Sequence, residues 1–227
     1  MLYTSCIVDN HLPESLLIMT LGPLTFGDRP LFLAPMEDVS DPPFRILCKR
    51  LGADMLYSEF ISTDGLNRGV EDAEQKLDIF PEERPIGIQV WGGEVDEVRR
   101  ATPRVDAAEP DIIDINFGCP VRKIVAKDGG AGILRDLDKM RAITETVIDA
   151  SSRPVTVKTR LGWDDQSIRI LEVAEMLESV GIAGLAVHAR TRSQQYGGEA
   201  RWQWLRRLKE EGVRNIPLIG NGDALDP

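Results

Sequence analysis

The chain has 227 residues, of which 42% are hydrophobic and 28% charged, so it is long enough for one large globular domain. Its net charge of −10 is opposite in sign to the basic surface expected of a nucleic-acid-binding protein. The three cysteines, Cys6, Cys48 and Cys119, form no CxxC pair, which indicates a reducing, cytoplasmic compartment. No segment approaches the ~20 apolar residues of a membrane span, so we expect no membrane partner.

Residues 1–20 show no clear hydrophobic period and lack the cationic start of a signal peptide. We expect them to form a loose leader. The regular pattern follows, and it predicts a domain over residues 21–227.

Short apolar runs alternate with longer amphipathic segments along this domain. The apolar runs are rich in Val and Ile, which is typical of strands buried on both faces of a parallel sheet. They cover residues 31–34, 55–57, 86–90, 112–115, 155–157, 185–187 and 217–219. The amphipathic segments predict helices over 42–51, 94–108, 137–150, 167–180 and 201–212. Pro103 interrupts the helix predicted over 94–108.

This βα order without a linker indicates an α/β protein with one parallel sheet. A doubly wound sheet and a barrel both fit the order. However, chemically distinctive residues follow all seven predicted strands, as in the segments Ala34-Pro35-Met36 and Asn116-Phe117-Gly118-Cys119-Pro120. In a barrel such ends surround one mouth, whereas a doubly wound sheet concentrates its site at one switch point. The sequence therefore favours a TIM (β/α)8-type barrel, incomplete, with about seven of eight strands.

Each candidate site residue also has a simpler structural interpretation. Cys119 is either a small buried side chain or a thiol facing the mouth, where it can donate a proton. Lys158 is either a solvated lysine or a charge directed at a cofactor. His188 is either a core histidine or, with Arg190 and Arg192, part of an anion-binding surface.

Some site classes are disfavoured by what the sequence lacks. Asn221-Gly222-Asp223 by itself indicates only a turn. The chain has no Walker A sequence, no GxGxxG fingerprint and no zinc-spaced cluster, so we expect no metal and no Rossmann domain.

Several motifs, in order, resemble one family. They are Ala34-Pro35-Met36, Asp41-Pro42-Pro43-Phe44-Arg45, Asp114-Ile115-Asn116-Phe117-Gly118-Cys119-Pro120, Lys123, Gly129-Gly130-Ala131-Gly132, Lys158-Thr159-Arg160-Leu161-Gly162-Trp163, His188-Ala189-Arg190-Thr191-Arg192 with Tyr196 and Gly198, and Asn221-Gly222-Asp223. The ordered set resembles the tRNA-dihydrouridine synthases, in particular the bacterial B-type branch. The resemblance runs from about residue 24 to the end of the chain.

This resemblance implies an FMN-binding TIM barrel that uses NADPH to reduce uridine in tRNA. The cofactor-binding residues implied are Pro35, Met36, Glu37, Gln89, Lys158, His188, Asn221, Gly222 and Asp223. Reduced flavin gives a hydride to C6 of uracil, and Cys119 protonates C5. The substrate-binding residues implied are Asn116, Arg160, Arg190 and Arg192. The target uridine is flipped into the mouth.

The chain departs from the family pattern at Pro227, where the family continues with an eighth strand and a helical tRNA-binding domain. We therefore expect unpaired edges on the first and seventh strands, because no eighth strand lies between them. We also expect a monomer that binds FMN weakly and tRNA poorly.

Two alternatives remain. One is another FMN-dependent barrel oxidoreductase, similar to a dihydroorotate dehydrogenase. The other is an inactive truncated remnant, against which the intact Cys119 and Lys158 count.

Overall fold

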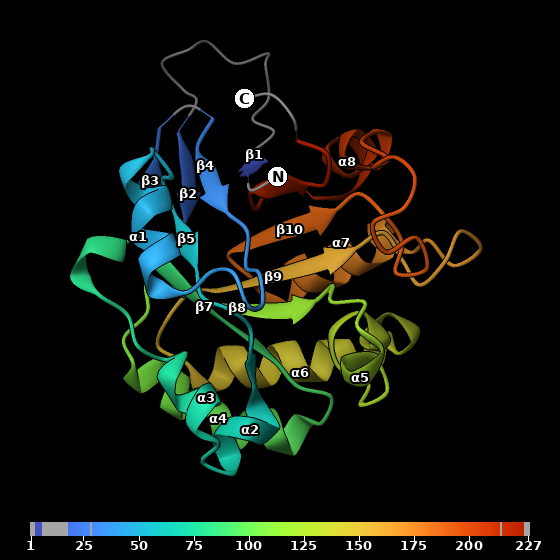
Figure 1. Ribbon diagram of the computed structural model, residues 1–227. Coiled ribbons are helices and arrows are strands. Elements are labelled where there is room, and N and C mark those ends of the chain that lie inside the picture. Colours follow the sequence, from blue (N-terminus) through green and yellow to red (C-terminus); the bar gives the residue numbers. More distant parts are fainter. Residues whose placement is uncertain (1–2, 6–17, 28, 214, 225–227) are drawn as a thin grey trace.

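The computed structural model describes residues 3–5, 18–27, 29–213 and 215–224. A curled parallel sheet forms the centre of the molecule, and helices α4, α6 and α7 lie along its outer face (Figure 1). The strands of this curled sheet are β4 (Leu31–Leu33), β5 (Leu56–Tyr57), β6 (Ile61–Ser62), β7 (Ile86–Trp91), β8 (Ile112–Phe117), β9 (Val155–Arg160), β10 (Gly184–His188) and β11 (Leu218–Asn221).

Neighbouring strands follow the order of the chain. Parallel pairing runs β5, β7, β8, β9, β10, β11; β6 also pairs with β7, and a bridge from Phe32 to Met55 joins β4 to β5. A doubly wound sheet would reverse its strand order at a switch point, and this sheet does not. The structure is therefore an incomplete (β/α) barrel, and the predicted fold class is confirmed.

Five of the described helices match the predicted ranges, whereas the short helices α2, α3 and α5 were not predicted. They are α1 (Pro42–Arg50), α2 (Thr63–Asn67), α3 (Glu71–Gln75), α4 (Val95–Ala107), α5 (Arg122–Val125), α6 (Leu137–Ala150), α7 (Ile170–Val180) and α8 (Gln203–Arg207), which a π-helical turn (Leu208–Gly212) extends. Helix α4 runs through Pro103, so the expected interruption is wrong. The packing of Val98, Ala101 and Val105 in the core offsets the one backbone donor that proline lacks. No helix in the described residues is long and apolar enough to cross a membrane.

Side chains alternate strictly along the central strands. On β8, Ile113, Ile115 and Phe117 pack outward against the helical layer, whereas Ile112 packs with the residues inside the barrel. Alternation then directs Asp114 and Asn116 inward above Ile112. From β7 to β11, the strands extend one to three residues beyond the predicted apolar runs, because polar positions continue the same ladders. The interior thus changes from apolar to polar toward the C-terminal ends of the strands.

A short hairpin closes the apolar end of the barrel. Strands β2 (Met19–Leu21) and β3 (Leu24–Phe26) pair antiparallel, and Met19, Leu21 and Phe26 pack with the interior cluster. A Cβ at Gly184 would lie 2.4 Å from Leu21 Cδ2, so the glycine is required for this contact. The hairpin begins at Met19, two residues before the predicted start of the domain. The rest of the predicted leader, apart from β1, lies mostly outside the described residues.

The edge of the first barrel strand is paired. Strand β1 (Tyr3–Ser5) runs antiparallel to β4, with Tyr3 opposite Leu33 and Ser5 opposite Leu31. It also lies against β11 (Figure 1). The expectation that the first strand has an unpaired edge is therefore wrong, since backbone from the N-terminal segment covers the exposed donors and acceptors.

A buried ion pair fixes α1 to the segment before β7. Arg45 Nε lies 2.7 Å from Glu83 Oε1, and the two side chains are 2% and 0% exposed. Arg45 also donates to the carbonyls of Ser40 and Asp78, and Glu83 accepts from the Phe80 N–H. This pair gives the arginine of the Asp41–Arg45 motif a structural role.

Replacing Glu83 with alanine leaves the Arg45 charge buried without its partner. We expect the free energy of unfolding to fall by about 3–5 kcal/mol, measured by urea denaturation. Asp96→Ala breaks an exposed pair with Arg99 and serves as the control. Equal midpoints for the two variants would contradict the structural role of the buried pair.

Candidate functional site

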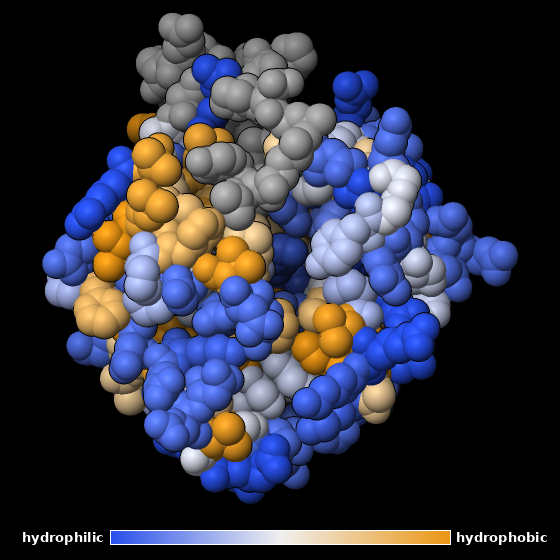
Figure 2. Space-filling model, viewed as in Figure 1, coloured by the Kyte–Doolittle hydropathy of each residue, from blue (hydrophilic) through white to orange (hydrophobic). Residues whose placement is uncertain are grey.

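A cavity of about 540 Å³ opens at the C-terminal ends of the barrel strands. Figure 2 shows a hollow near the middle of the face seen in Figure 1, with hydrophobic patches beside it. The cavity brings together most of the residues singled out from the sequence: Pro35, Met36, Glu37, Asn116, Cys119, Lys158, Arg160, His188, Arg190, Asn221, Gly222 and Asp223. Its size and mixed lining are typical of a cofactor or small-molecule site. We call it the mouth cavity.

Two of the residues singled out do not line this cavity. Gln89 is fully buried below it and accepts a 2.8 Å hydrogen bond from the side chain of Asn116. Arg192 stacks over the ring of Trp163, with its guanidinium carbon 4.4 Å from the ring centroid. Gln89 therefore acts on the cavity through Asn116, and Arg192 lies outside the lining.

The loop that carries Cys119 is held by backbone hydrogen bonds. Asn116 Oδ1 accepts from the backbone N–H groups of Gly118 (3.0 Å) and Cys119 (2.9 Å). The Cys119 carbonyl accepts from the Ala131 N–H at 2.9 Å. Gly130 has φ +52°, and a Cβ there would lie 2.7 Å from the Cys119 carbonyl oxygen, so this close approach needs glycine.

Burial raises the pKa of the Cys119 thiol above its ordinary value of 9.0. The nearby charges of Lys158 and Arg160 oppose this shift without cancelling it. At neutral pH the thiol therefore keeps its proton. A protonated thiol on the wall of a cavity can act as a general acid.

Lys158 is the cation of this cavity that remains available for a ligand. Burial, with a contribution from Arg160, lowers the pKa of Lys158 to about 8, so the ammonium is still mostly charged at pH 7. Its Nζ forms no hydrogen bond with any described residue. A charged donor in this position favours an anionic ligand group in the cavity.

The two arginines of the mouth cavity are tied to the protein itself. Arg160 donates to the carbonyls of Gly118 and Gln195, both at 2.7 Å, and so joins the loops after β8 and β10. Arg190 pairs with Asp223 at 2.6 Å and also donates to the Gly198 carbonyl. Both guanidinium groups therefore shape the wall of the cavity.

His188 is a neutral ring in this cationic environment. Burial, together with Lys158, Arg160 and Arg190, lowers its pKa to about 2. Arg190 Nη1 lies 3.3 Å from His188 Nε2 and can only donate, so Nε2 accepts and Nδ1 carries the proton. Gly222 has φ +102°, and a Cβ there would lie 2.7 Å from the His188 ring.

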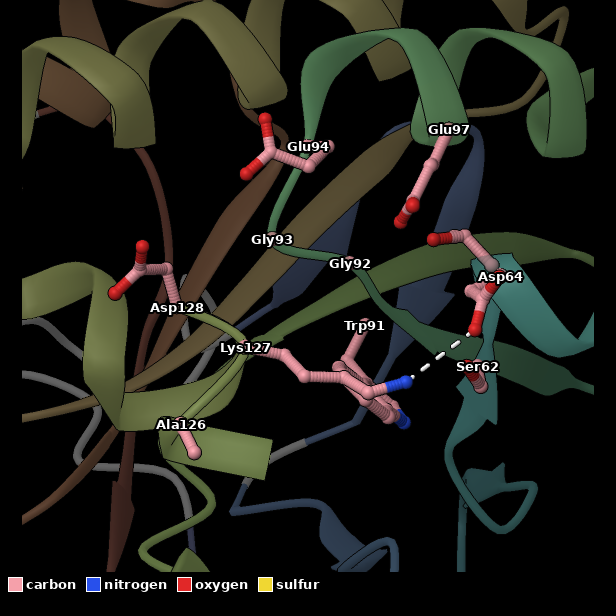
Figure 3. A pocket seen from close by; sticks show the side chains of 11 residues that line it. Ser62, Asp64, Trp91, Gly92, Gly93, Glu94, Glu97, Ala126, Lys127 and Asp128 are labelled. Atoms are coloured by element: carbon pink, nitrogen blue, oxygen red, sulfur yellow. Dashed lines mark hydrogen bonds and ion pairs between the residues drawn. The ribbon is translucent and has the colours of Figure 1, made fainter. Parts of the chain in front are cut away.

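A second hollow, beside the end of β7, has the opposite charge. The carboxylates of Asp64, Glu94, Glu97 and Asp128 line it, with Lys127 paired to Asp64 at 3.3 Å (Figure 3). Its acidic lining disfavours phosphates and other anions. Among the residues that the structure describes, no three His, Cys, Asp or Glu side chains form a potential metal site.

The mouth cavity offers hydrogen-bond donors that suit an anionic ligand. The available Lys158 ammonium and the neutral His188 Nδ1–H are both donors, and Gly222 brings backbone close to the histidine. The two donors lie on the adjacent strands β9 and β10, and Gly222 directly follows β11.

A parallel (β/α) barrel with its reactive side chains at the C-terminal ends of the strands defines an enzyme of the TIM-barrel class. The family model described as "Dihydrouridine synthase (Dus)" matches residues 32–227. The chain therefore belongs to the dihydrouridine synthase family, and this part of the sequence-based prediction is confirmed.

The names of similar curated proteins agree with this family assignment. The chain is 41% identical over 206 residues to "Probable tRNA-dihydrouridine synthase 1" of Synechocystis sp., covering 90% of this chain and 57% of that protein. It is 38% identical over 210 residues to "tRNA-dihydrouridine synthase B" of Pseudomonas aeruginosa, covering 92% and 62%. The chain thus spans about 60% of the length of the curated relatives it matches.

Solved structures resemble the chain in fold alone. A histamine dehydrogenase from Rhizobium sp. 4-9 aligns with a TM-score of 0.61 at 13% identity, covering 92% of this chain and 43% of that one. A variant of NCR from Zymomonas mobilis aligns with a TM-score of 0.57 at 18% identity, covering 93% and 80%.

The pKa of His188 gives a direct test of the charge arrangement. We expect no titration of its ring between pH 5 and pH 8, because burial and three cations keep it neutral. Proton NMR of the ring signals measures this, and His188→Gln identifies the signal. A midpoint near the ordinary value of 6.5 would contradict the arrangement.

Proposed function

We propose that this chain carries the catalytic barrel of a tRNA-dihydrouridine synthase, which reduces the 5,6 double bond of uridine in tRNA. One observation carries the proposal: the protonated thiol of Cys119 and the available ammonium of Lys158 line the same cavity. A proton donor and an anion-binding group are what a flavin-dependent reduction needs from the protein. A monomeric, cytoplasmic protein is part of the proposal.

The proposed cofactor is FMN, with NADPH as the reductant. Pro35, Met36 and Glu37 line the cavity from the β4 side, and Lys158 faces it from β9. His188 and the Asn221-Gly222-Asp223 turn would hold the ribityl and phosphate groups. Bound and reduced, FMN supplies the hydride that adds to C6 of uracil.

Cys119 supplies the matching proton. Hydride addition at C6 leaves negative charge that a proton at C5 must neutralise, and the Cys119 thiol is the donor on the cavity wall. Asn116 donates one amide hydrogen to Gln89, which leaves its second amide hydrogen for an oxygen of the uracil. The target base must leave its stack in order to reach these groups.

The proposed roles of the arginines follow from their contacts. Arg160 and Arg190 hold the loops that form the cavity wall, next to the base. Arg192, stacked on Trp163, is the proposed contact to tRNA phosphate outside the cavity. The stack fixes its planar guanidinium, which suits phosphate recognition.

Lys158→Met removes the available charge with little change in volume. We expect FMN affinity, measured by quenching of flavin fluorescence, to fall by roughly 10- to 100-fold, as for the loss of a charge-assisted hydrogen bond. Lys123→Met is the control, because Lys123 is exposed and lies outside the mouth cavity. Equal affinities for the two variants would contradict the assignment of the flavin site.

Cys119→Ala tests the proposed activity. With FMN, NADPH and unmodified tRNA, we expect dihydrouridine formation to fall by about 10²- to 10⁴-fold, the usual contribution of a general acid. Nucleoside mass spectrometry measures the product. Cys48→Ala, a buried cysteine on α1, is the control. A flavin-loaded protein that forms no dihydrouridine would contradict the proposed function.

A further inference from the structure

A row of buried polar residues lies directly below the mouth cavity. Gln89 on β7, Asp114 on β8 and Thr156 on β9 occupy the same register across three neighbouring strands. All three side chains are at most 2% exposed. Buried polar groups of this kind are stable only when their hydrogen bonds are satisfied.

The carboxylate of Asp114 lies at the centre of this row. Gln89 Nε2 donates to Asp114 Oδ2 at 2.5 Å, and Thr156 Oγ1 donates to Asp114 Oδ1 at 2.6 Å. An ionised carboxylate can only accept hydrogen bonds. It therefore fixes which end of the Gln89 amide is which: Nε2 faces Asp114, and Oε1 faces away.

The orientation passes from Gln89 to Asn116. Gln89 Oε1 can only accept, so Asn116 must present its Nδ2, which donates at 2.8 Å. Asn116 Oδ1 then faces the opposite way and accepts the backbone N–H groups of Gly118 and Cys119. If the Asn116 amide were reversed, its NH₂ group would face two N–H donors, and neither hydrogen bond could form.

We propose that Asp114 is a positioning residue, whose acceptor-only carboxylate sets the orientation of two successive amides and thereby holds the Cys119 loop at the mouth. The assigned role of Cys119 as proton donor rests on the proposed function. The orientation of the two amides does not depend on it.

The charge of Asp114 is costly to the fold. Burial raises its pKa to about 6, although the hydrogen bonds from Gln89 and Thr156 and the charge of Lys158 oppose the shift. Since this pKa lies above the ordinary value of 3.8, the folded state binds the proton more tightly than the unfolded state does. The stability from this group therefore falls as pH rises from about 4 to about 6.

Asp114→Asn removes the acceptor-only character with almost no change in shape. Asparagine can present either its oxygen or its NH₂ to Gln89, so a reversed Gln89 amide becomes accessible, and in that orientation Gln89 offers Asn116 Nδ2 no acceptor. Alkylation of Cys119 by iodoacetamide, followed by peptide mass spectrometry on the 227-residue chain, then reports how firmly the loop is held. We expect alkylation about fivefold faster, the population change produced by losing one hydrogen bond.

Thr156→Val is the matched control. It removes the other hydrogen bond to Asp114 and leaves the contact with Gln89 intact. We expect its alkylation rate to stay within about twofold of the unsubstituted chain, while its thermal midpoint falls. For Asp114→Asn we expect the opposite combination: alkylation of Cys119 becomes faster, while the thermal midpoint at pH 7.5 stays unchanged or rises.

Side-chain amide NMR gives a second measurement that needs no variant to fold. In the unsubstituted chain, the NH₂ signals of Gln89 and Asn116 should change together as Asp114 takes up a proton near pH 6. Lys158 is the charged group that faces Asp114, and it stays protonated throughout this range. Unchanged amide signals across this pH range, or equal alkylation rates for Asp114→Asn and Thr156→Val, would overturn the proposal. Neither readout requires flavin, tRNA or turnover, so failure here is distinct from failure of the proposed function.

Discussion

The structure depends on the two-residue alternation of side chains along the strands of a curled sheet. On β8 and β9, every second residue points into the barrel, so Asp114, Asn116, Thr156 and Lys158 share one interior. The residues between them form the contact with the outer helices. A shift of one residue in any strand would exchange the two sets, which ties the position of the site to the packing of the core.

Because of this alternation, the side chains inside the barrel change from apolar to polar to cationic along its axis. The β2–β3 hairpin fills the apolar end of the barrel, opposite the mouth cavity. In the middle of the barrel, the side chains of Asp114, Gln89 and Asn116 satisfy one another's hydrogen bonds. The cationic side chains lie at the mouth cavity. There Lys158 has no hydrogen-bond partner among the described residues, and the arginines donate to loop carbonyls. A chain with net charge −10 thus presents a locally cationic cavity, and the acidic hollow beside the end of β7 lies apart from it. The local charge, rather than the total, decides what the site binds.

Sequence patterns predicted much of the fold and of the candidate site, because the strands and the residues that follow them are local features of the sequence. Seven of the eight strands described in the curled sheet, five of the eight described helices, and the meeting of Cys119, Lys158 and His188 at one cavity all followed from the sequence patterns. What was missed depends on contacts between distant segments. One example is the pairing of β1 with β4, since residues 1–20 carry no periodic signal. Another is the β2–β3 hairpin that closes the barrel, whose three-residue strands are too short to give a periodic pattern. Asp114 appeared in the motif, but its role requires the register of β7, β8 and β9. Arg190 was expected to bind RNA, and only the structure shows its pairing with Asp223.

In the reaction that we propose, the exchangeable thiol proton of Cys119 adds to C5 of uracil, while C6 receives a hydride from the reduced cofactor. Performing the reaction in D₂O with unlabelled NADPH and locating deuterium in the product by nucleoside NMR tests this directly. The thiol proton exchanges with solvent, so we predict deuterium at C5 of dihydrouridine, the carbon that the thiol protonates. The N–H of a reduced flavin also exchanges with solvent, so C6 can carry either isotope. Ordinary hydrogen at C5 would contradict the account.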